Sequence, residues 1–308
     1  MTGQRVPSHG QAVAVMVAAT LLWSIAGVVT RHLESARSFE VTFWRSAFNA
    51  LALVLLLSWI RGPRGLWRSL STGGRALWLS AACWCVMYTA FMLALTLTTV
   101  ANVLITMALA PLFTALAARV ALGHRLKPRT WLAIAVAGLG IAWMYGTELS
   151  GGEPRHLWGT LVALGVPLAA ATNWTLLQHQ AGRPHGGAQA QPAADMLCAV
   201  LLGALLSALL TLPLAMPLQA SVHDLSLLAT LGVFQLAIPC LMAVTAARTL
   251  KAPEAALLSL LEVVFGVGWA WLGAGEAPSQ AVLGGGALVL AALAANEVAA
   301  LRERSAIR

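Results

Sequence analysis

Long hydrophobic runs without charge, separated by short polar segments, dominate the chain. Six stretches contain no Asp, Glu, Lys or Arg: residues 6–30, 76–118, 130–147, 156–182, 196–223 and 225–247. Three more runs complete the pattern: residues 41–60 with Arg45, 255–272 with Glu262, and 280–296. A helix needs about 20 apolar residues to cross the hydrocarbon core of a bilayer. Residues 76–118 are long enough for two helices joined at a polar turn, so the pattern predicts ten membrane-spanning helices.

Composition supports the same fold class. Of 308 residues, 59% are hydrophobic and 10% are charged, against about 25% charged in an average globular chain. So few polar side chains cannot cover the surface of a water-soluble protein, and we expect an all-α integral membrane protein. The first run, residues 12–30, has no small-x-small cleavage site before Arg31 and is longer than the core of a signal peptide. We therefore expect it to be a retained helix.

The basic residues predict the orientation in the membrane. With a cytoplasmic N-terminus, 15 of the 19 Lys and Arg residues fall in cytoplasmic loops or tails, and Arg31, Arg37 and Arg155 fall outside. The positive-inside rule then places both termini in the cytoplasm. The net charge of +8 is explained by loops that face anionic lipid, so it gives no reason to expect a nucleic-acid partner. Membrane lipid is an expected partner, and the oligomeric state is left open.

Motifs for metal or cofactor binding are missing from the sequence. The four cysteines lie inside predicted spans without a CxxC pair, and the seven histidines form no HExxH. The sequence contains neither a P-loop nor a GxSxG elbow. We expect no cofactor, no metal site and no enzymatic activity.

A faint internal repeat appears when the chain is shifted by 151 to 152 positions. It aligns these pairs: Trp23-Ser24 with Trp174-Thr175, Leu109 with Leu261, Phe113 with Phe265, and Gly123 with Gly275. The predicted organisation is an N-terminal tail (1–10), a first five-helix repeat (11–145), an extracytoplasmic linker (146–157), a second repeat (158–296) and a C-terminal tail (297–308). Because five is odd, the second repeat must run in the opposite direction. Such inverted-topology repeats are typical of secondary transporters, which bind cargo near the bilayer midplane between the halves.

Several short motifs resemble the EamA-type transporters of the drug/metabolite transporter superfamily. In the first half they are Ala94-Leu95, Thr98-Thr99-Val100-Ala101-Asn102, Leu104-Ile105, Pro111-Leu112-Phe113 and Gly123; in the second half they are 252–256, Leu261-Glu262, Phe265 and Gly275-Glu276. Arg45, Trp23 and Trp174 also match the pattern of that family. Two positions depart from it: His124 replaces the Glu that often follows the glycine, and Val263 replaces the Pro that often follows the intramembrane Glu. The first departure puts in doubt a shared role of the Gly-Glu pair in the first half, and the second removes an expected helix distortion.

The resemblance covers nearly the whole chain and implies a function. It implies a ten-helix carrier of a bacterial inner membrane that exports small metabolites by alternating access, and neutral or aromatic amino acids are the cargo that we expect. An ion gradient or the gradient of the cargo itself would drive it. Two alternatives stay open: a membrane-embedded enzyme acting on lipids, and the same fold carrying drugs or nucleotide-sugars.

Two charged residues inside predicted spans are candidate site residues. Glu262 lies near the middle of its span, where a charge facing lipid costs about 2.5–3.5 kcal/mol on insertion scales. It must therefore face protein or water, either as a cargo or proton site or as a structural carboxylate. Arg45 and Asn49 lie closer to the end of their span, and the long Arg stem can reach the interface. We therefore favour gating or structure over direct binding for these two.

Aromatic and polar residues in other spans complete the candidate site. Trp84, Tyr88 and Phe91 follow one helix face, and Trp23 and Trp174 are related by the repeat. Buried Trp and Tyr need hydrogen-bond partners, which a hydrated cavity supplies. We expect the following residues to line the cavity: Trp23, Tyr88, Trp174, Asn102, Thr106 and Gln235. Pro111 and Pro239 lie within spans, where proline removes a backbone hydrogen bond, so they are hinge candidates or static bends.

Overall fold

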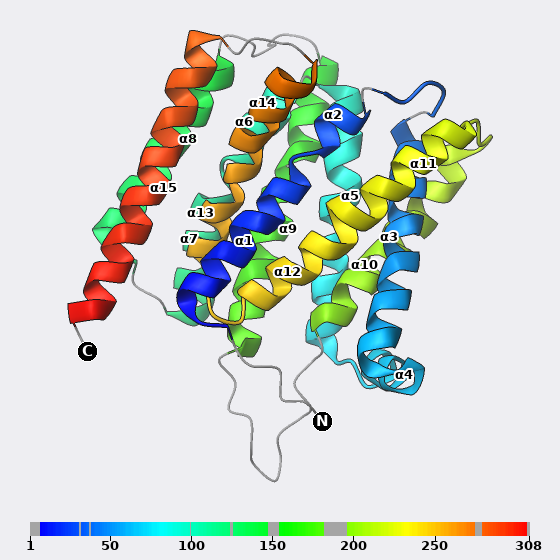
Figure 1. Cartoon of the computed structure of the whole chain (residues 1–308), viewed down its shortest axis with the longest axis horizontal. Helices are drawn as coiled ribbons and strands as arrows, with labels where there is room; N and C mark the ends of the chain where they lie inside the picture. Colours follow the sequence, from blue (N-terminus) through cyan, green and yellow to red (C-terminus); the bar gives the residue numbers. More distant parts are fainter. Residues whose placement is uncertain are drawn as a thin grey trace.

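The chain folds into a bundle of helices that run between two ends (Figure 1). The computed structural model describes residues 7–30, 32–36, 38–98, 100–123, 126–146, 154–181, 196–274 and 279–306. The first half contains α1 (His9–Trp23), α2 (Ala26–Thr30), α3 (Ser38–Arg61), α4 (Pro63–Ser71), α5 (Arg75–Leu97), α6 (Val100–Met107), α7 (Ala110–Leu122) and α8 (Pro128–Tyr145). The second contains α9 (Pro154–Ala181), α10 (Met196–Ala215), α11 (Val222–Thr230), the π-helix η2 (Leu231–Ala237), α12 (Ile238–Ala246), α13 (Ala252–Ser259), α14 (Leu261–Ala274) and α15 (Gln280–Ala306). Within these ranges no residue forms a strand.

The helices have the length and composition of membrane spans. Seven segments are long and apolar enough to cross a bilayer: His9–Thr30, Phe39–Arg61, Arg75–Ala94, Leu157–Ala181, Met196–Ala215, Val222–Ala246 and Ala252–Trp269. Three shorter helices are also apolar: Ala110–Leu122, Pro128–Met144 and Gln280–Asn296. An all-helical membrane fold is therefore confirmed, and the count of ten complete spans stays a prediction.

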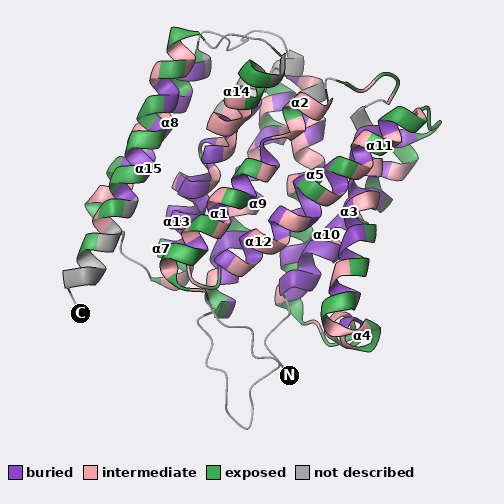
Figure 2. Cartoon of the chain, viewed as in Figure 1, coloured by how far each residue is buried: buried purple, intermediate pink, exposed green. Residues whose placement is uncertain are grey.

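Apolar side chains face outward and many polar side chains face inward. Leu139, Leu168 and Leu209 are exposed, whereas Ser46 and Asn49 are completely buried. Figure 2 shows exposed residues along the outer faces of the helices and buried residues between them. This distribution suits a hydrocarbon environment, where an exposed Leu costs nothing and a polar side chain must find a partner inside the protein.

Contacts at one end of the bundle reveal the direction of the two halves. Thr249 donates a hydrogen bond to the carbonyl oxygen of Pro7 (3.0 Å), and the Gln178 side chain accepts one from the amide of Ala252 (2.8 Å). The start of α1, the end of α9 and the start of α13 therefore lie together, at the end of the bundle that carries both chain termini (Figure 1). Hence α1 and α9, the first long helices of the two halves, run in opposite directions, as the inverted-repeat hypothesis requires.

At the opposite end, each half holds a loop of the other through a buried carboxylate. Asp224 accepts hydrogen bonds from the amides of residues 34–36, at 2.8–3.0 Å, and from the Ser35 hydroxyl. Glu40 accepts two hydrogen bonds, both 2.8 Å, from the amides of Gln219 and Ala220. Carboxylates that accept backbone N–H groups form strong hydrogen bonds. The two halves are thus joined at this end by reciprocal contacts.

Helix packing follows the repeat. Helix α5 packs on α9, and α12 packs on α1; α3 pairs with α10, and α8 pairs with α15. Where α8 crosses α15, a Cβ added to Gly140 would lie 2.7 Å from the Gly285 carbonyl oxygen, and one added to Gly285 would collide with the Gly140 carbonyl oxygen. Small residues at membrane helix crossings allow this close backbone approach.

Three helical segments are interrupted. The first break separates α1 from α2 after Trp23, the second separates α6 from α7 after Met107, and the third separates α13 from α14 after Ser259. The predicted turn within residues 76–118 is present, because α5 ends at Leu97. The break after Met107 in this stretch was not predicted from the sequence.

Several predicted boundaries differ from the structure. Helix α15 continues to Ala306 instead of ending near residue 296, because the Ala, Glu, Leu and Arg residues that follow are strong helix formers. The second half begins earlier than residue 158, since α9 starts at Pro154. The short helix α4 was not predicted because its nine residues include three charged or glycine positions, Arg64, Gly65 and Arg68. Most of the predicted linker, residues 147–153, and most of the predicted N-terminal tail lie outside the described residues.

Candidate functional site

A cavity of about 130 Å³ lies between the two halves of the bundle, where the helices are interrupted. Residues beside all three breaks line it: Trp23, Met107 and Ala110, and Ser259, Leu260 and Glu262. Non-helical backbone at membrane depth is tolerated where it is buried in protein or lines a cavity, and interrupted helices frequently form the cargo sites of transporters. Five of the residues predicted to lie in the cavity, Trp23, Tyr88, Trp174, Gln235 and Glu262, line it.

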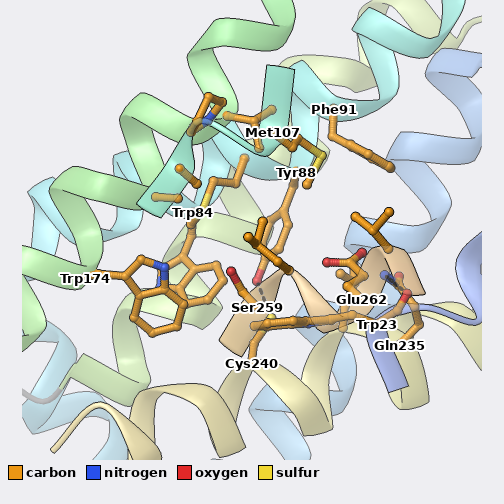
Figure 3. A pocket seen from close by; sticks show the side chains of 18 of the residues that line it. Trp23, Trp84, Tyr88, Phe91, Met107, Trp174, Gln235, Cys240, Ser259 and Glu262 are labelled. Carbon is orange, nitrogen blue, oxygen red and sulfur yellow. Dashed lines mark hydrogen bonds between the residues drawn. The ribbon is translucent and has the colours of Figure 1, made fainter. Parts of the chain in front are cut away.

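The repeat relates residues on opposite walls of this cavity. Five lining residues of the first half have a mate 151 or 152 positions later that also lines the cavity, as in the pairs Trp23 and Trp174, Trp84 and Leu236, Tyr88 and Cys240, Met107 and Ser259, and Ala110 and Glu262. The Tyr88 hydroxyl donates a hydrogen bond to the Cys240 thiol at 3.3 Å, drawn as a dashed line in Figure 3. Two residues that are mates in the repeat touch each other only near the axis that relates the halves. The cavity therefore lies on the pseudo-two-fold axis.

The π-helix η2 positions Gln235. A π-helical turn inserts an extra residue into a helix and is frequent at functional sites. The Gln235 amide donates to the Trp23 carbonyl oxygen at 3.3 Å, and its own Oε1 has no partner among the described residues. Ser24, which directly follows Trp23 at the break, accepts a hydrogen bond from the Trp269 indole at 3.0 Å. The broken first span is thus held by side chains of the second half.

Arg45 lies in the cavity wall and not at the interface. Only 2% of its surface is exposed, and its Nη2 donates to the Tyr88 carbonyl oxygen at 3.4 Å. The possibility that its stem reaches the membrane interface is therefore wrong: residues of α5 and η2 cover α3 at this position. Helix η2 packs closely against α3 at Arg45, because a Cβ added to Gly232 of η2 would lie 2.9 Å from the Arg45 carbonyl oxygen. Asn49, one turn further along α3, is completely buried and does not line the cavity.

The other predicted site residues lie elsewhere. Thr106 is buried beside the cavity, but its neighbour Met107 lines it instead. The Asn102 side chain lies outside the described residues. Pro111 is the second residue of α7, in the first turn after a break, and Pro239 is the second residue of α12, which continues directly from η2. Proline is tolerated at Pro111 because the first turn of a helix leaves its N–H groups free. At Pro239 the helical chain is continuous, and local π-helical geometry such as that of η2 helps to accommodate the missing N–H. Whether either residue acts as a hinge stays a prediction.

Some lining residues were missing from the sequence-based prediction. They include Trp84, Cys240 and Ser259. The repeat offset contains the signal that finds two of them, since 152 positions separate Cys240 from Tyr88 and Ser259 from Met107. Trp84 follows from the helix-face stripe that contains Tyr88, and their rings lie 5.7 Å apart.

Comparison with known proteins supports the transporter fold. One solved structure, titled "Crystal structure of protein", matches 96% of this chain and 99% of its own with a TM-score of 0.78 at 18% identity, which shows a shared fold. No curated protein matches the chain. Residues 10–146 match the EamA-like transporter family. The first half of the chain is therefore similar to EamA-like transporters, and this supports a membrane transporter of the drug/metabolite type.

Proposed function

We propose that the protein is a secondary transporter that moves small metabolites, foremost neutral or aromatic amino acids, by alternating access. The observation that carries the proposal is the cavity on the pseudo-two-fold axis, walled by repeat mates from two oppositely directed halves. In such an arrangement the halves can exchange conformations, so that a site on the axis is reached from either side of the membrane. The family match of residues 10–146 supports the same class of function.

The walls of the cavity favour an aromatic or apolar cargo. Trp23, Trp84, Tyr88, Phe91 and Trp174 all line it, and aromatic pairs gain about 0.5–1.5 kcal/mol beyond the burial of their surface. The volume of about 130 Å³ is well below the roughly 300–1,000 Å³ of pockets for drug-sized ligands. A single Arg in the wall is also poorly suited to phosphorylated cargo such as a nucleotide-sugar. The cavity is therefore better suited to amino acids than to drugs.

Orientation and direction are part of the same proposal. Both termini lie at one end of the bundle (Figure 1), and most Lys and Arg residues belong to the loops and tails that the positive-inside rule assigns to the cytoplasm. We assign this end to the cytoplasm of a bacterial inner membrane. Export is the direction that the family resemblance implies, with either ion coupling or facilitated diffusion.

Uptake into proteoliposomes tests the proposal. A panel of radiolabelled amino acids is assayed with wild type, Trp174→Ala and the control Trp158→Ala, with and without an imposed proton gradient. Trp158 lies on the same helix, but it is 64% exposed and outside the cavity. Saturable uptake of an aromatic or neutral amino acid, reduced about tenfold or more in Trp174→Ala and retained in Trp158→Ala, is expected.

Other outcomes would redirect the proposal. If no amino acid is transported under either condition, the amino-acid cargo is wrong, and drugs and other metabolites become the next panel. Turnover of a lipid extract by the purified protein would instead support the membrane-enzyme alternative.

A further inference from the structure

The cavity is lined by two charged side chains of opposite sign, the buried Arg45 and the partly buried Glu262. Arg45 and Glu262 are the only charged residues among those that line it. Each costs about 2.5–3.5 kcal/mol to place near the membrane centre on insertion scales. Because they reach the same cavity from α3 of the first half and α14 of the second, they can compensate each other while it is empty.

Hydrogen-bonding capacity around these charges is left unused. Arg45 donates a long hydrogen bond of 3.4 Å to the Tyr88 carbonyl oxygen, and its buried Nε has no partner among the described residues. No described residue donates a hydrogen bond to the Glu262 carboxylate, and Gln235 Oε1 also has no partner among the described residues. Buried polar groups in folded proteins are nearly always paired, so unpaired groups that face a cavity indicate a missing ligand or water.

The two sides of the cavity differ in polarity. In Figure 3, Glu262 and Gln235 lie together beside Trp23, while Trp84 and Trp174 lie together on the other side. Tyr88 and Cys240 stand between the two groups. A cargo that fits this arrangement has a cationic group at the side of Glu262 and Gln235 and an apolar or aromatic group at the other side.

We propose that the cargo is a zwitterion bound in one orientation, with its ammonium group at Glu262 and Gln235, its carboxylate at Arg45, and its side chain between Trp84 and Trp174. This proposal rests on the carrier function proposed above and assigns Arg45 a binding role in place of the gating role expected from its sequence position. A guanidinium suits a carboxylate geometrically, since it can donate two parallel N–H bonds.

The charge balance predicts selectivity. A zwitterion adds no net charge to the buried pair and gives each member a partner. A cation of the same shape leaves Arg45 without its new partner, and an anion leaves Glu262 without one. Because an unpaired buried charge is strongly disfavoured, either analogue should bind more weakly than the zwitterion.

The test compares three compounds that share a side chain and differ in the charged groups attached to it. They are phenylalanine, phenylalaninamide (a cation) and 3-phenylpropionate (an anion), assayed at about pH 6, where the α-amino group is protonated. Quenching of tryptophan fluorescence in the purified wild type reports binding, and inhibition of amino-acid uptake into proteoliposomes reports competition. Leucine, leucinamide and 4-methylpentanoate form a second set, so that the result does not depend on an aromatic side chain. We expect each analogue to bind at least about tenfold more weakly than its parent amino acid.

Variants assign each charge to its partner. Arg45→Gln should narrow the difference between phenylalanine and its amide, while Glu262→Gln should narrow the difference between phenylalanine and 3-phenylpropionate. Arg45→Lys should restore part of the preference for a carboxylate. Thermal melting and gel filtration show which variants are folded. If a variant is not folded, the relative binding of the three compounds to the wild type tests the proposal.

The outcomes separate this proposal from the proposed function. Equal binding of all three compounds by wild type overturns the charge assignment while transport of the amino acid still supports the carrier. Equal loss of all three in both variants also overturns it, because a structural role would give that result. If neither parent amino acid is bound or transported, both the zwitterion proposal and the amino-acid cargo are wrong.

Discussion

The two halves of the molecule share a framework but contribute different chemistry to the cavity. At three mate positions the first half supplies Trp84, Tyr88 and Met107, and the second half supplies Leu236, Cys240 and Ser259. At a fourth position, the small Ala110 of the first half faces its mate Glu262. The halves therefore share a two-fold frame and differ at most of the mate positions that line the cavity. A cargo is not symmetric, so a site on the axis can recognise it only if the repeat is broken there.

The largest expected effect comes from removing the Glu262 carboxylate, and a second variant then places a carboxylate at the mate position, Ala110. Glu262→Ala should lower amino-acid uptake into proteoliposomes by about tenfold or more, since losing a charged hydrogen-bond partner costs about 1.5–3 kcal/mol. The double variant Ala110→Glu/Glu262→Ala restores one carboxylate at the related place on the opposite wall. We expect it to recover part of the uptake. If uptake by the double variant is no higher than uptake by Glu262→Ala, a carboxylate at position 110 does not replace one at position 262.

Ala110→Glu alone is the control for this exchange. It places two carboxylates in one small cavity, and like charges at close range disfavour each other. It should reduce uptake, so that recovery in the double variant reflects position and not merely the presence of a second Glu.

The reciprocal loop contacts at the end opposite the termini should be unequal in strength. Asp224→Asn exchanges an oxygen that accepts backbone N–H groups for an NH₂ group that repels them, and we expect a loss of about 2 kcal/mol or more in stability. Glu40→Gln should cost less, because only Oε1 accepts the loop amides, Oε2 has no partner among the described residues, and glutamine keeps one carbonyl oxygen. Thermal melting in detergent measures both. A larger loss in Glu40→Gln would contradict this ranking of the two contacts.

The smallest effect tests the crossing of α8 and α15. Gly140→Ala places a methyl group against the backbone of α15 and should destabilise the protein by about 1–3 kcal/mol, as overpacking does. Gly138→Ala is the matched control two residues away, where an added Cβ meets nothing within 4 Å. There we expect no loss, or a gain of up to about 1 kcal/mol from helix propensity. Equal melting temperatures of the two variants would show that α8 and α15 cross less closely than described.

The sequence by itself determined the class of fold and much of the cavity lining. Uncharged runs of the length of a bilayer leave no other solution than helices, because backbone groups in hydrocarbon must be paired within their own segment. The internal offset marked Trp23 and Trp174 as mates, and the cost of burying a charge required Glu262 to face protein or water. These inferences depend only on spacing and on transfer free energies, which are properties of the sequence.

Tertiary structure alone decided where individual side chains point. The position of Arg45 near the end of a predicted span suggested that its side chain reaches the membrane interface. Packing of η2 at Gly232 and the contact with Tyr88 instead bury Arg45 in the cavity wall. The breaks after Met107 and Ser259 and the π-helix that carries Gln235 also depend on neighbouring helices. An interrupted helix loses backbone hydrogen bonds, and only the surrounding helices can make that loss tolerable. No local sequence pattern contains this information, because the partners lie far apart in the chain: Tyr88 is 43 residues from Arg45, and Trp23 is 212 residues from Gln235.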